Sequence, residues 1–207
     1  AERLEGYSAA GVNRVTVGIQ SLDDGVLARV GRLHDAKGAL DAVARARSAG
    51  FERVGLDLIA GLPGERLEAW ERSVARAASS GADHVSMYLI ETDKDTPLAR
   101  RLAAGELDEP CAATIETLFA ETEERLPGRG YARYEVSNWS LPSRACRHNL
   151  GYWNDRPYIG FGSSSHSYYQ GVRRSCNLSA ARYIETVARG SQTRTALDDG
   201  AASTRLG

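Results

Sequence analysis

Residues 51–64 read FERVGLDLIAGLPG, and this stretch decides how the rest of the chain is interpreted. An apolar run containing only Gly55 and Asp57 as interruptions, closed by a glycine-proline turn, predicts a strand buried on both faces of a sheet. A carboxylate inside such a strand is costly unless it is paired. We therefore expect a cation or a set of hydrogen-bond donors beside Asp57. The alternative is a structural role, in which Asp57 caps a loop or pairs with an arginine.

Composition favours an ordinary globular chain. Of the 207 residues, 42% are hydrophobic and 26% are charged, and 26 basic residues against 27 acidic ones give a net charge of −1. This balance predicts neither a nucleic-acid partner nor an anionic membrane surface. The sequence has no secretory leader pattern and no apolar run of membrane-spanning length, so we expect a cytoplasmic protein without a membrane segment.

The cysteines are few and widely spaced. Cys111, Cys146 and Cys176 fit a reducing compartment and match no common zinc or iron–sulfur ligand spacing. We expect this chain to supply no metal cluster by itself.

Strand and helix patterns alternate through the first half of the chain. Strands are predicted at residues 13–20, 51–64 and 84–90, and helices at 1–10, after Leu22, after Asp35 and at 65–80. Strands separated by helices pair in parallel through right-handed crossovers, so we expect an α/β fold with a parallel sheet. Ligands bind such sheets at the carboxyl ends of the strands, where Gln20, the turn at 61–64 and Glu91 should meet.

The second half of the chain is less regular. Thr96 and Pro97 predict the start of a short helix, and a longer helix is predicted at 111–126. A strand is predicted at 131–136, followed by a loop at 139–157 rich in aromatic and basic residues. A glycine- and serine-rich segment at 158–168 precedes a helix capped by Ser179 and closed by Gly190. The polar residues after 190 are expected to be poorly ordered.

Five segments together resemble one family. They are GVNRVTVGIQS at 11–21, GRLH at 31–34, DLIAGLPG at 57–64, YEVSNW at 134–139 and CRHNLGYW at 146–153. In order and spacing they are similar to the radical S-adenosylmethionine (SAM) family of oxygen-independent coproporphyrinogen III oxidases and their relatives. The HNxxYW pattern at 148–153 resembles the heme-chaperone branch of that family.

This resemblance implies a partial (β/α) barrel. Residues 1–108 are similar to the last three units of a six-unit radical SAM barrel, 109–190 to a smaller family-specific α+β region with an HNxxYW loop, and 191–207 form a tail. In the family, a CxxxCxxC loop in the first half holds a 4Fe-4S cluster, and this sequence lacks it. The strand at Val15 would then leave an open edge, so we expect self-association or another segment to cover it.

The resemblance also implies two ligand sites. Gln20, Arg32 and Asp57 occupy positions that contact SAM in the family, and a guanidinium with side-chain acceptors suits its amino-acid group. The alternative is that Arg32 only pairs with Asp57. The types of the residues at 61–64 are explained by turn geometry alone.

The second implied site is for heme, with His148 as the iron ligand and Tyr152 and Trp153 as flat apolar faces. Nearby arginines would meet the propionates: Arg144, Arg147 and Arg156. The alternative for His148 is a simple hydrogen-bonding role. Among other candidates, Cys146 is a thiolate ligand or a small buried residue, His166 is a weaker heme ligand, and His34 and His84 are structural.

Three functions follow from these patterns. The first is a heme-binding chaperone that transfers heme to an acceptor protein, without turnover by this chain. The second is an oxygen-independent coproporphyrinogen III oxidase of porphyrin biosynthesis, and the third is an inactive remnant. The HNxxYW pattern favours the first.

Overall fold

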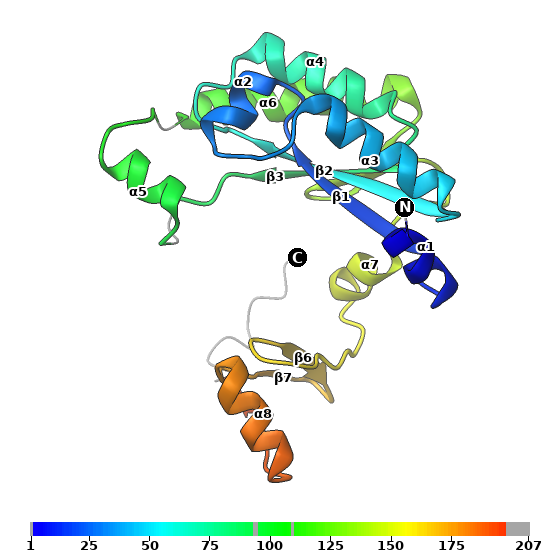
Figure 1. The fold of residues 1–207 in the computed structure, drawn as a ribbon, viewed down its shortest axis with the longest axis vertical. Helices are drawn as coiled ribbons and strands as arrows, with labels where there is room; N and C mark the ends of the chain where they lie inside the picture. The colour runs from blue at the N-terminus through cyan, green and yellow to red at the C-terminus, as the bar shows by residue number, and fades with distance from the viewer. Residues whose placement is uncertain (1, 93–94, 109, 198–207) are drawn as a thin grey trace. The chain divides into compact units, whose positions relative to one another are not determined.

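The computed structural model describes residues 2–92, 95–108 and 110–197. The chain divides into two compact units, Ala1–Ala145 and Cys146–Gly207 (Figure 1). Within the described ranges, no helix combines the length and apolar character needed to cross a membrane.

The first unit is built on a five-stranded sheet in the order β1-β2-β3-β5-β4. Strands β1 (Arg14–Gln20), β2 (Arg53–Ala60) and β3 (His84–Leu89) are parallel neighbours. Strands β5 (Asn138–Ser140) and β4 (Ala132–Glu135) continue the sheet in antiparallel pairing. The predicted parallel α/β fold, with three strands ending at one edge, is therefore confirmed.

Six helices of this unit begin close to the predicted positions: α1 (Glu2–Ala9), α2 (Asp24–Arg29), α3 (Ala36–Ser48), α4 (Leu67–Ala78), α5 (Pro97–Ala103) and α6 (Ala112–Arg125). Their starts follow from local chemistry, because the side chains of Asp23, Asp35 and Thr96 cap the first turns of α2, α3 and α5. Helix α6 is followed by the 3₁₀ turn η1 (Pro127–Arg129).

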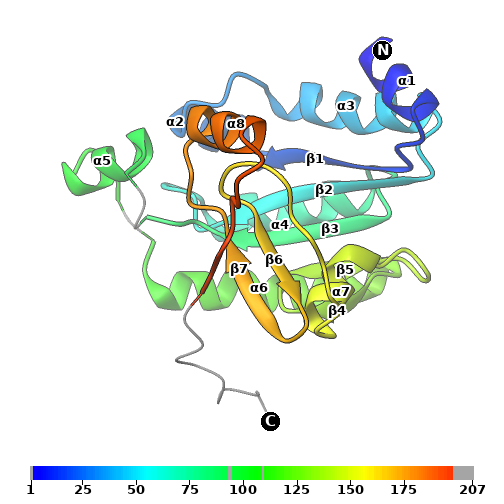
Figure 2. The same cartoon turned by 90° about the horizontal axis from the view of Figure 1, so that it is seen from below.

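The pleat of β2 separates two kinds of surface. Val54, Leu56 and Leu58 are fully buried on the face that α3, α4 and α6 cover (Figures 1 and 2). Asp57 and Ile59 face the other way and are only half-buried. The expectation that this strand is buried on both faces is therefore wrong, because Asp57 and Ile59 on its second face remain partly exposed.

Helices α4 and α6 are joined by a buried indole. Trp70 Nε1 donates to the Leu118 carbonyl at 2.9 Å and to Thr122 Oγ1 at 3.0 Å. Leu118 and Thr122 are the buried residues of α6. The polar atom of this large side chain is thus satisfied inside the core.

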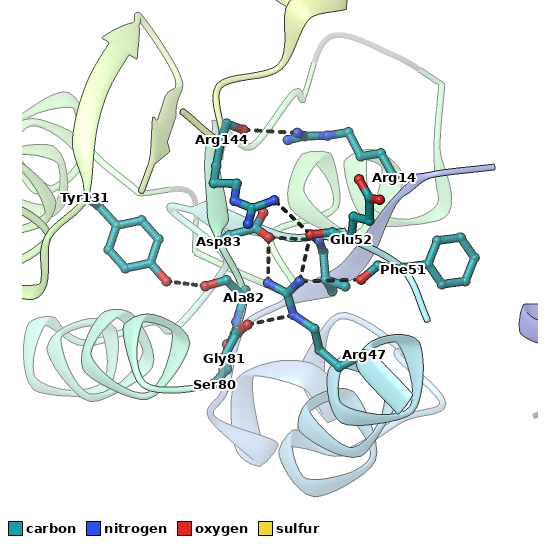
Figure 3. A network of polar contacts seen from close by, with 11 residues as sticks. Arg14, Arg47, Phe51, Glu52, Ser80, Gly81, Ala82, Asp83, Tyr131 and Arg144 are labelled. Carbon is teal, nitrogen blue, oxygen red and sulfur yellow. Dashed lines mark hydrogen bonds and ion pairs between the residues drawn. The ribbon is translucent and has the colours of Figure 1, made fainter. Parts of the chain in front are cut away.

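Arg47 links α3 to the amino ends of β2 and β3 through hydrogen bonds and an ion pair (Figure 3). Its guanidinium contacts Asp83 Oδ2 at 2.5 Å and donates to the carbonyls of Gly81 and Glu52, both at 3.0 Å. Glu52 also accepts from Arg144 at 3.1 Å. Segments before β2 and β3 and after β5 are thereby tied to α3.

The compact first unit extends beyond the division predicted at residue 108. Helix α6 packs on α4, and β5 pairs with β3, so residues up to 145 join the same unit. The division between barrel and family-specific region remains a prediction about family architecture. Strand β1 is outermost in the described sheet, and its covering by another segment or partner also remains a prediction.

The second unit contains α7 (Arg147–Trp153), β6 (His166–Tyr169), β7 (Val172–Ser175), α8 (Ala180–Ala188) and β8 (Thr195–Ala196). The three strands form a separate antiparallel sheet in the order β6-β7-β8. Ser179 caps α8 as predicted, yet Ile184 and Val187 on that helix are exposed.

Two expectations about this part of the chain need correction. Residues 139–157 are not one loop, because β5 ends within them and the HNxxYW residues lie on α7, whose first bond joins Leu150 N to the Cys146 carbonyl at 3.0 Å. This short helix was not predicted because its aromatic and basic residues do not form a helical apolar pattern. The tail after 190 also forms strand β8, whereas residues 198–207 lie outside the described residues.

Replacing Arg47 with methionine tests the fastening at the amino ends of the strands. The Asp83 side chain is only 4% exposed, so the change leaves a buried carboxylate without its cation and should lower the free energy of unfolding by about 3 kcal/mol. Urea unfolding followed by circular dichroism measures this loss. The matched control is Lys37→Met, whose exposed pair with Asp41 should contribute less than about 0.5 kcal/mol. Equal effects of the two changes would contradict the assignment.

Candidate functional site

The carboxyl end of β1 is shaped around Gln20. This residue has a left-handed backbone with φ of 66°, and the pairing of β1 with β2 shifts register between Gly18 and Gln20. A Cβ at position 18 would lie 2.6 Å from Gln20 Nε2. The glycine therefore leaves the space that the glutamine amide uses.

Asp57 lies beside this feature, because its register partners are Gly18 in β1 and Ser86 in β3. Burial raises the pKa of the Asp57 carboxyl, while a hydrogen bond with the Ser86 side chain and the positive charge of Arg14 act in the opposite direction. The groups found beside Asp57 are thus the Ser86 hydroxyl and the positive charge of Arg14. An arginine near Asp57 also fits the alternative in which this carboxylate has only a structural role.

Arg32 lies in the loop after α2 and is exposed. No ion pair in the described part of the chain joins it to Asp57, so the predicted alternative of a simple Arg32–Asp57 pair is not observed. Arg32 instead lines a cavity of about 450 Å³ together with Ile59, Leu62, Ile90 and Glu91. This cavity lies where β2 and β3 end, as expected for a ligand site of a parallel sheet.

The turn after β2 depends on backbone geometry at two glycines. Gly61 and Gly64 have φ of 83° and 73°, values that side chains with a Cβ rarely adopt. A Cβ at position 64 would also lie 1.7 Å from Arg29 Nη1, which donates to the Pro63 carbonyl at 3.2 Å. The residue types of this turn are explained without a ligand.

Glu65 was not predicted as part of the site. Its Oε2 accepts from Gly61 N at 3.3 Å, and its Oε1 lies 3.4 Å from the Ser21 hydroxyl. Burial is the main cause that raises the pKa of Glu65 to about 8. This carboxyl links the end of β1 to the turn after β2. The only signal in the sequence is the position of this glutamate directly after the turn. The apolar spacing that follows led to its prediction as the first residue of a helix.

A second buried polar pair lies on the Asp57 face of the sheet. His84 Nε2 is 2.7 Å from the Tyr134 hydroxyl, and His84 Nδ1 is buried without a hydrogen-bond partner among the described residues. Burial lowers the pKa of His84 to about 3, so the imidazole is neutral at physiological pH. Neighbouring Asn138 likewise has a buried Oδ1 without a partner. This face therefore presents unused polar atoms close to Asp57.

In the second unit, His148 begins a row of aromatic rings. Its ring centroid lies 4.6 Å from that of Tyr152, which lies 4.6 Å from Tyr158, both with nearly perpendicular planes. His148 is exposed and makes no hydrogen bond within the described residues. Trp153 is 53% exposed. The i, i+4 spacing on α7 thus places the predicted histidine and tyrosine together.

The other residues predicted near heme are distributed differently. Arg144 lies in the first unit and donates to the Glu52 carbonyl at 3.1 Å, and its contact with a propionate stays a prediction. Arg147 and Arg156 are exposed on and after α7. Cys146 occupies the N-cap position of that helix, and His166 begins β6 and is exposed. None of the three cysteines forms a disulfide.

No metal centre is preformed in the part of the chain that the structure describes. Within residues 2–92, 95–108 and 110–197, no three or more His, Cys, Asp or Glu side chains are grouped to bind a metal ion. A heme bound through one histidine needs no such group.

Comparison with known proteins places these features in a family context. A family model described as the Radical SAM superfamily matches residues 1–77. Heme chaperone HemW of Mycobacterium tuberculosis is 43% identical over 170 residues, which make up 82% of this chain and 43% of that protein. Heme chaperone HemW of Bacillus subtilis is 34% identical over 188 residues, or 91% of this chain and 50% of that protein. The chain spans about half the length of these relatives.

The solved structure of Escherichia coli coproporphyrinogen III oxidase (HemN), described as a radical SAM enzyme, has a similar fold. The TM-score is 0.77 at 21% sequence identity, covering 95% of this chain and 48% of that one. At this identity the likeness concerns the fold, which it confirms as a partial radical SAM α/β barrel with a further region.

Replacing Glu65 with glutamine tests the buried carboxyl. Because the folded-state pKa of about 8 lies above the ordinary value of 4.5, the protonated form stabilises the fold at low pH. This contribution is lost as the pH rises from about 4.5 to about 8, with a slope approaching about 1.4 kcal/mol per pH unit. Urea unfolding at several pH values should show the unmodified chain losing stability relative to Glu65→Gln.

The matched control for this measurement is Glu68→Gln, which removes an exposed carboxylate three residues away, in the first turn of α4. Its stability should run parallel to that of the unmodified chain across the pH range. If Glu65→Gln also runs parallel, Glu65 is an ordinary ionised carboxylate.

Proposed function

We propose that this chain carries heme. It belongs to the radical SAM superfamily, in the coproporphyrinogen III oxidase-like group, and it is similar to the heme chaperones. In this proposal the chain binds heme as cargo and passes it to an acceptor protein. The activity, cargo and partner are proposed for a chain that spans about half of its relatives' length.

The observation that carries the proposal is the environment of His148. Its imidazole is exposed and unpaired in the described chain, beside the rings of Tyr152 and the exposed Trp153. A neutral imidazole is a competent axial ligand for heme iron, and aromatic faces suit the flat macrocycle. Arg147 and Arg156 supply positive charge on the same short helix and just after it.

Exposure of the site supports transfer rather than storage. Sites that retain small molecules usually bury most of the ligand surface. His148, Tyr152 and Trp153 are all exposed on α7, so one face of the macrocycle would remain accessible to an acceptor. We expect this exchange in the cytoplasm, with the acceptor unidentified.

The oxidase alternative receives less support. The relatives named as heme chaperones share 34–43% identity with this chain, whereas the oxidase resembles it at 21% identity. The 207 residues contain no CxxxCxxC sequence. No redox step is therefore assigned to residues of this chain.

We also propose that the first unit contributes to SAM binding through Gln20, Arg32 and Asp57. Gln20 and Asp57 lie at neighbouring strand positions, and Arg32 lines the cavity at the strand ends. The guanidinium suits the carboxylate of SAM, and the glutamine and aspartate oxygens suit its ammonium. The unpaired state of Arg32 in the described chain is consistent with this role.

Titration with hemin tests the heme proposal. The unmodified chain should shift the Soret band of hemin at near-equal stoichiometry, and His148→Ala should abolish that shift because the iron loses its protein ligand. The matched control His166→Ala should keep the shift. If the folded, unmodified chain causes no Soret shift, the heme proposal is rejected and the inactive-remnant alternative is supported. If only His166→Ala loses the shift, His166 in β6 is the iron ligand instead of His148.

Calorimetric titration with SAM tests the second proposal separately. Arg32→Gln should weaken binding by about tenfold, because one charge-assisted hydrogen bond is worth about 1.5 kcal/mol or more. Arg66→Gln, which removes another exposed arginine of the same unit, should not change binding. Identical affinities of the Arg32→Gln and unmodified chains would remove Arg32 from the site.

A further inference from the structure

The second unit contains a cavity that the heme proposal does not use. Its volume is about 390 Å³, within the usual range of ligand pockets, and it is bordered by β6, β7 and the segment before β8. Arg174 and Arg194 line it, together with the hydroxyl-bearing residues Ser167, Ser191 and Thr193. No carboxylate is among its lining residues.

Neither arginine is neutralised within the described chain. Arg174 donates to the Tyr169 carbonyl at 3.4 Å, and Arg194 donates to the Gly160 carbonyl at 2.5 Å. The Nε of Arg194 is buried and has no hydrogen-bond partner. A guanidinium offers five N–H donors, so both side chains retain donors for an anion.

The second unit as a whole also has more basic than acidic residues. Between residues 146 and 207 the sequence has eight arginines, no lysine and four acidic residues. The two acids among the described residues are paired, Asp155 with Arg173 at 3.8 Å and Glu185 with Arg189 at 2.5 Å, and the other two lie outside the described residues. The near-neutral total of the whole chain conceals this local excess of positive charge. Among the described residues, an anion entering the cavity meets no competing carboxylate.

The hydroxyls complete a donor set. Ser167 Oγ accepts from Gly160 N at 3.0 Å, which leaves its own proton available for donation. Phosphate and carboxylate oxygens accept well from guanidinium and hydroxyl groups together. Tyr169 and Ile159 add apolar surface at the same cavity. The set suits an oxyanion carried on a small organic body.

This cavity is distinct from the heme-binding surface proposed at His148. In the β6–β7 hairpin, Tyr168 pairs with Arg173 and Ser167 pairs with Arg174, so the two pairs face opposite sides of the sheet. The Tyr168 ring belongs to the aromatic row through Tyr158, with Arg173 over it at 5.3 Å. Ser167 and Arg174 line the cavity on the other side.

We propose that this cavity is a binding site for a small oxyanion, the phosphate or carboxylate group of a metabolite, separate from the heme surface. Arg174 and Arg194 hold the anion, and Ser167 donates a further hydrogen bond. Occupancy would neutralise part of the excess positive charge of the unit.

Nuclear magnetic resonance titration of the full chain tests the site with inorganic phosphate, pyrophosphate and citrate, against chloride at equal ionic strength. Saturable shifts of the Ser167 and Thr193 amides are expected with an oxyanion and not with chloride. Stronger binding of pyrophosphate than citrate assigns the site to phosphate groups, and the reverse assigns it to carboxylates. Shifts that merely follow ionic strength would overturn the proposal.

Variants make the test specific. Arg174→Gln and Arg194→Gln should each weaken binding by at least about tenfold, as expected for loss of a charged donor. Arg182→Gln on α8 removes the same charge outside the cavity and should leave affinity unchanged. If Arg194→Gln fails to fold, Arg174→Gln decides. Equal weakening by all three changes shows nonspecific attraction and rejects the site.

A hemin competition separates this proposal from the heme proposal. Bound phosphate should leave the hemin affinity unchanged, and His148→Ala should leave the phosphate affinity unchanged. Competition between the two ligands would mean that one surface binds both and would overturn the claim of a separate site.

Discussion

The alternation of side chains along β2 is the constraint on which the first unit depends. Val54, Leu56 and Leu58 are buried on the face of the sheet that the helices cover. The residues between them face the opposite side of the sheet. Because parallel neighbours share this alternation, Gly18, Asp57 and Ser86 lie in one row across three strands. The core and the polar face are consequences of the same pleat, and moving β2 by one residue would exchange them.

Local signals made much of this fold predictable from sequence. The parallel strands have clear apolar runs, and Asp23, Asp35, Thr96 and Ser179 mark helix starts through side-chain bonds to the following turn. Strand β5 was missed because its three residues are defined by pairing with β3 rather than by their own pattern. Helix α7 was missed because aromatic and basic residues occupy its short length.

The site was predictable to a different degree in each unit. Motif resemblance predicts ligand contacts at Gln20, Arg32, Asp57 and His148, and these roles stay predictions; the structure brings Gln20 next to the Asp57 strand and His148 next to Tyr152. Glu65 and His84 owe their shifted pKa values to burial by residues distant in sequence, which no local pattern reveals. Whole-chain net charge does not reveal the positive charge of the second unit, because that arginine-rich unit is averaged with an acidic first unit.

The Arg47 fastening has a consequence for sequence variation. Apart from Asp83, the acceptors around this guanidinium are main-chain carbonyls of Phe51, Glu52 and Gly81. A carbonyl oxygen is present whatever side chain its residue carries, so these bonds do not themselves restrict the residue type at the three positions. Only the arginine and the aspartate would have to be inherited together, and a homologue that lost one should be found to have lost the other.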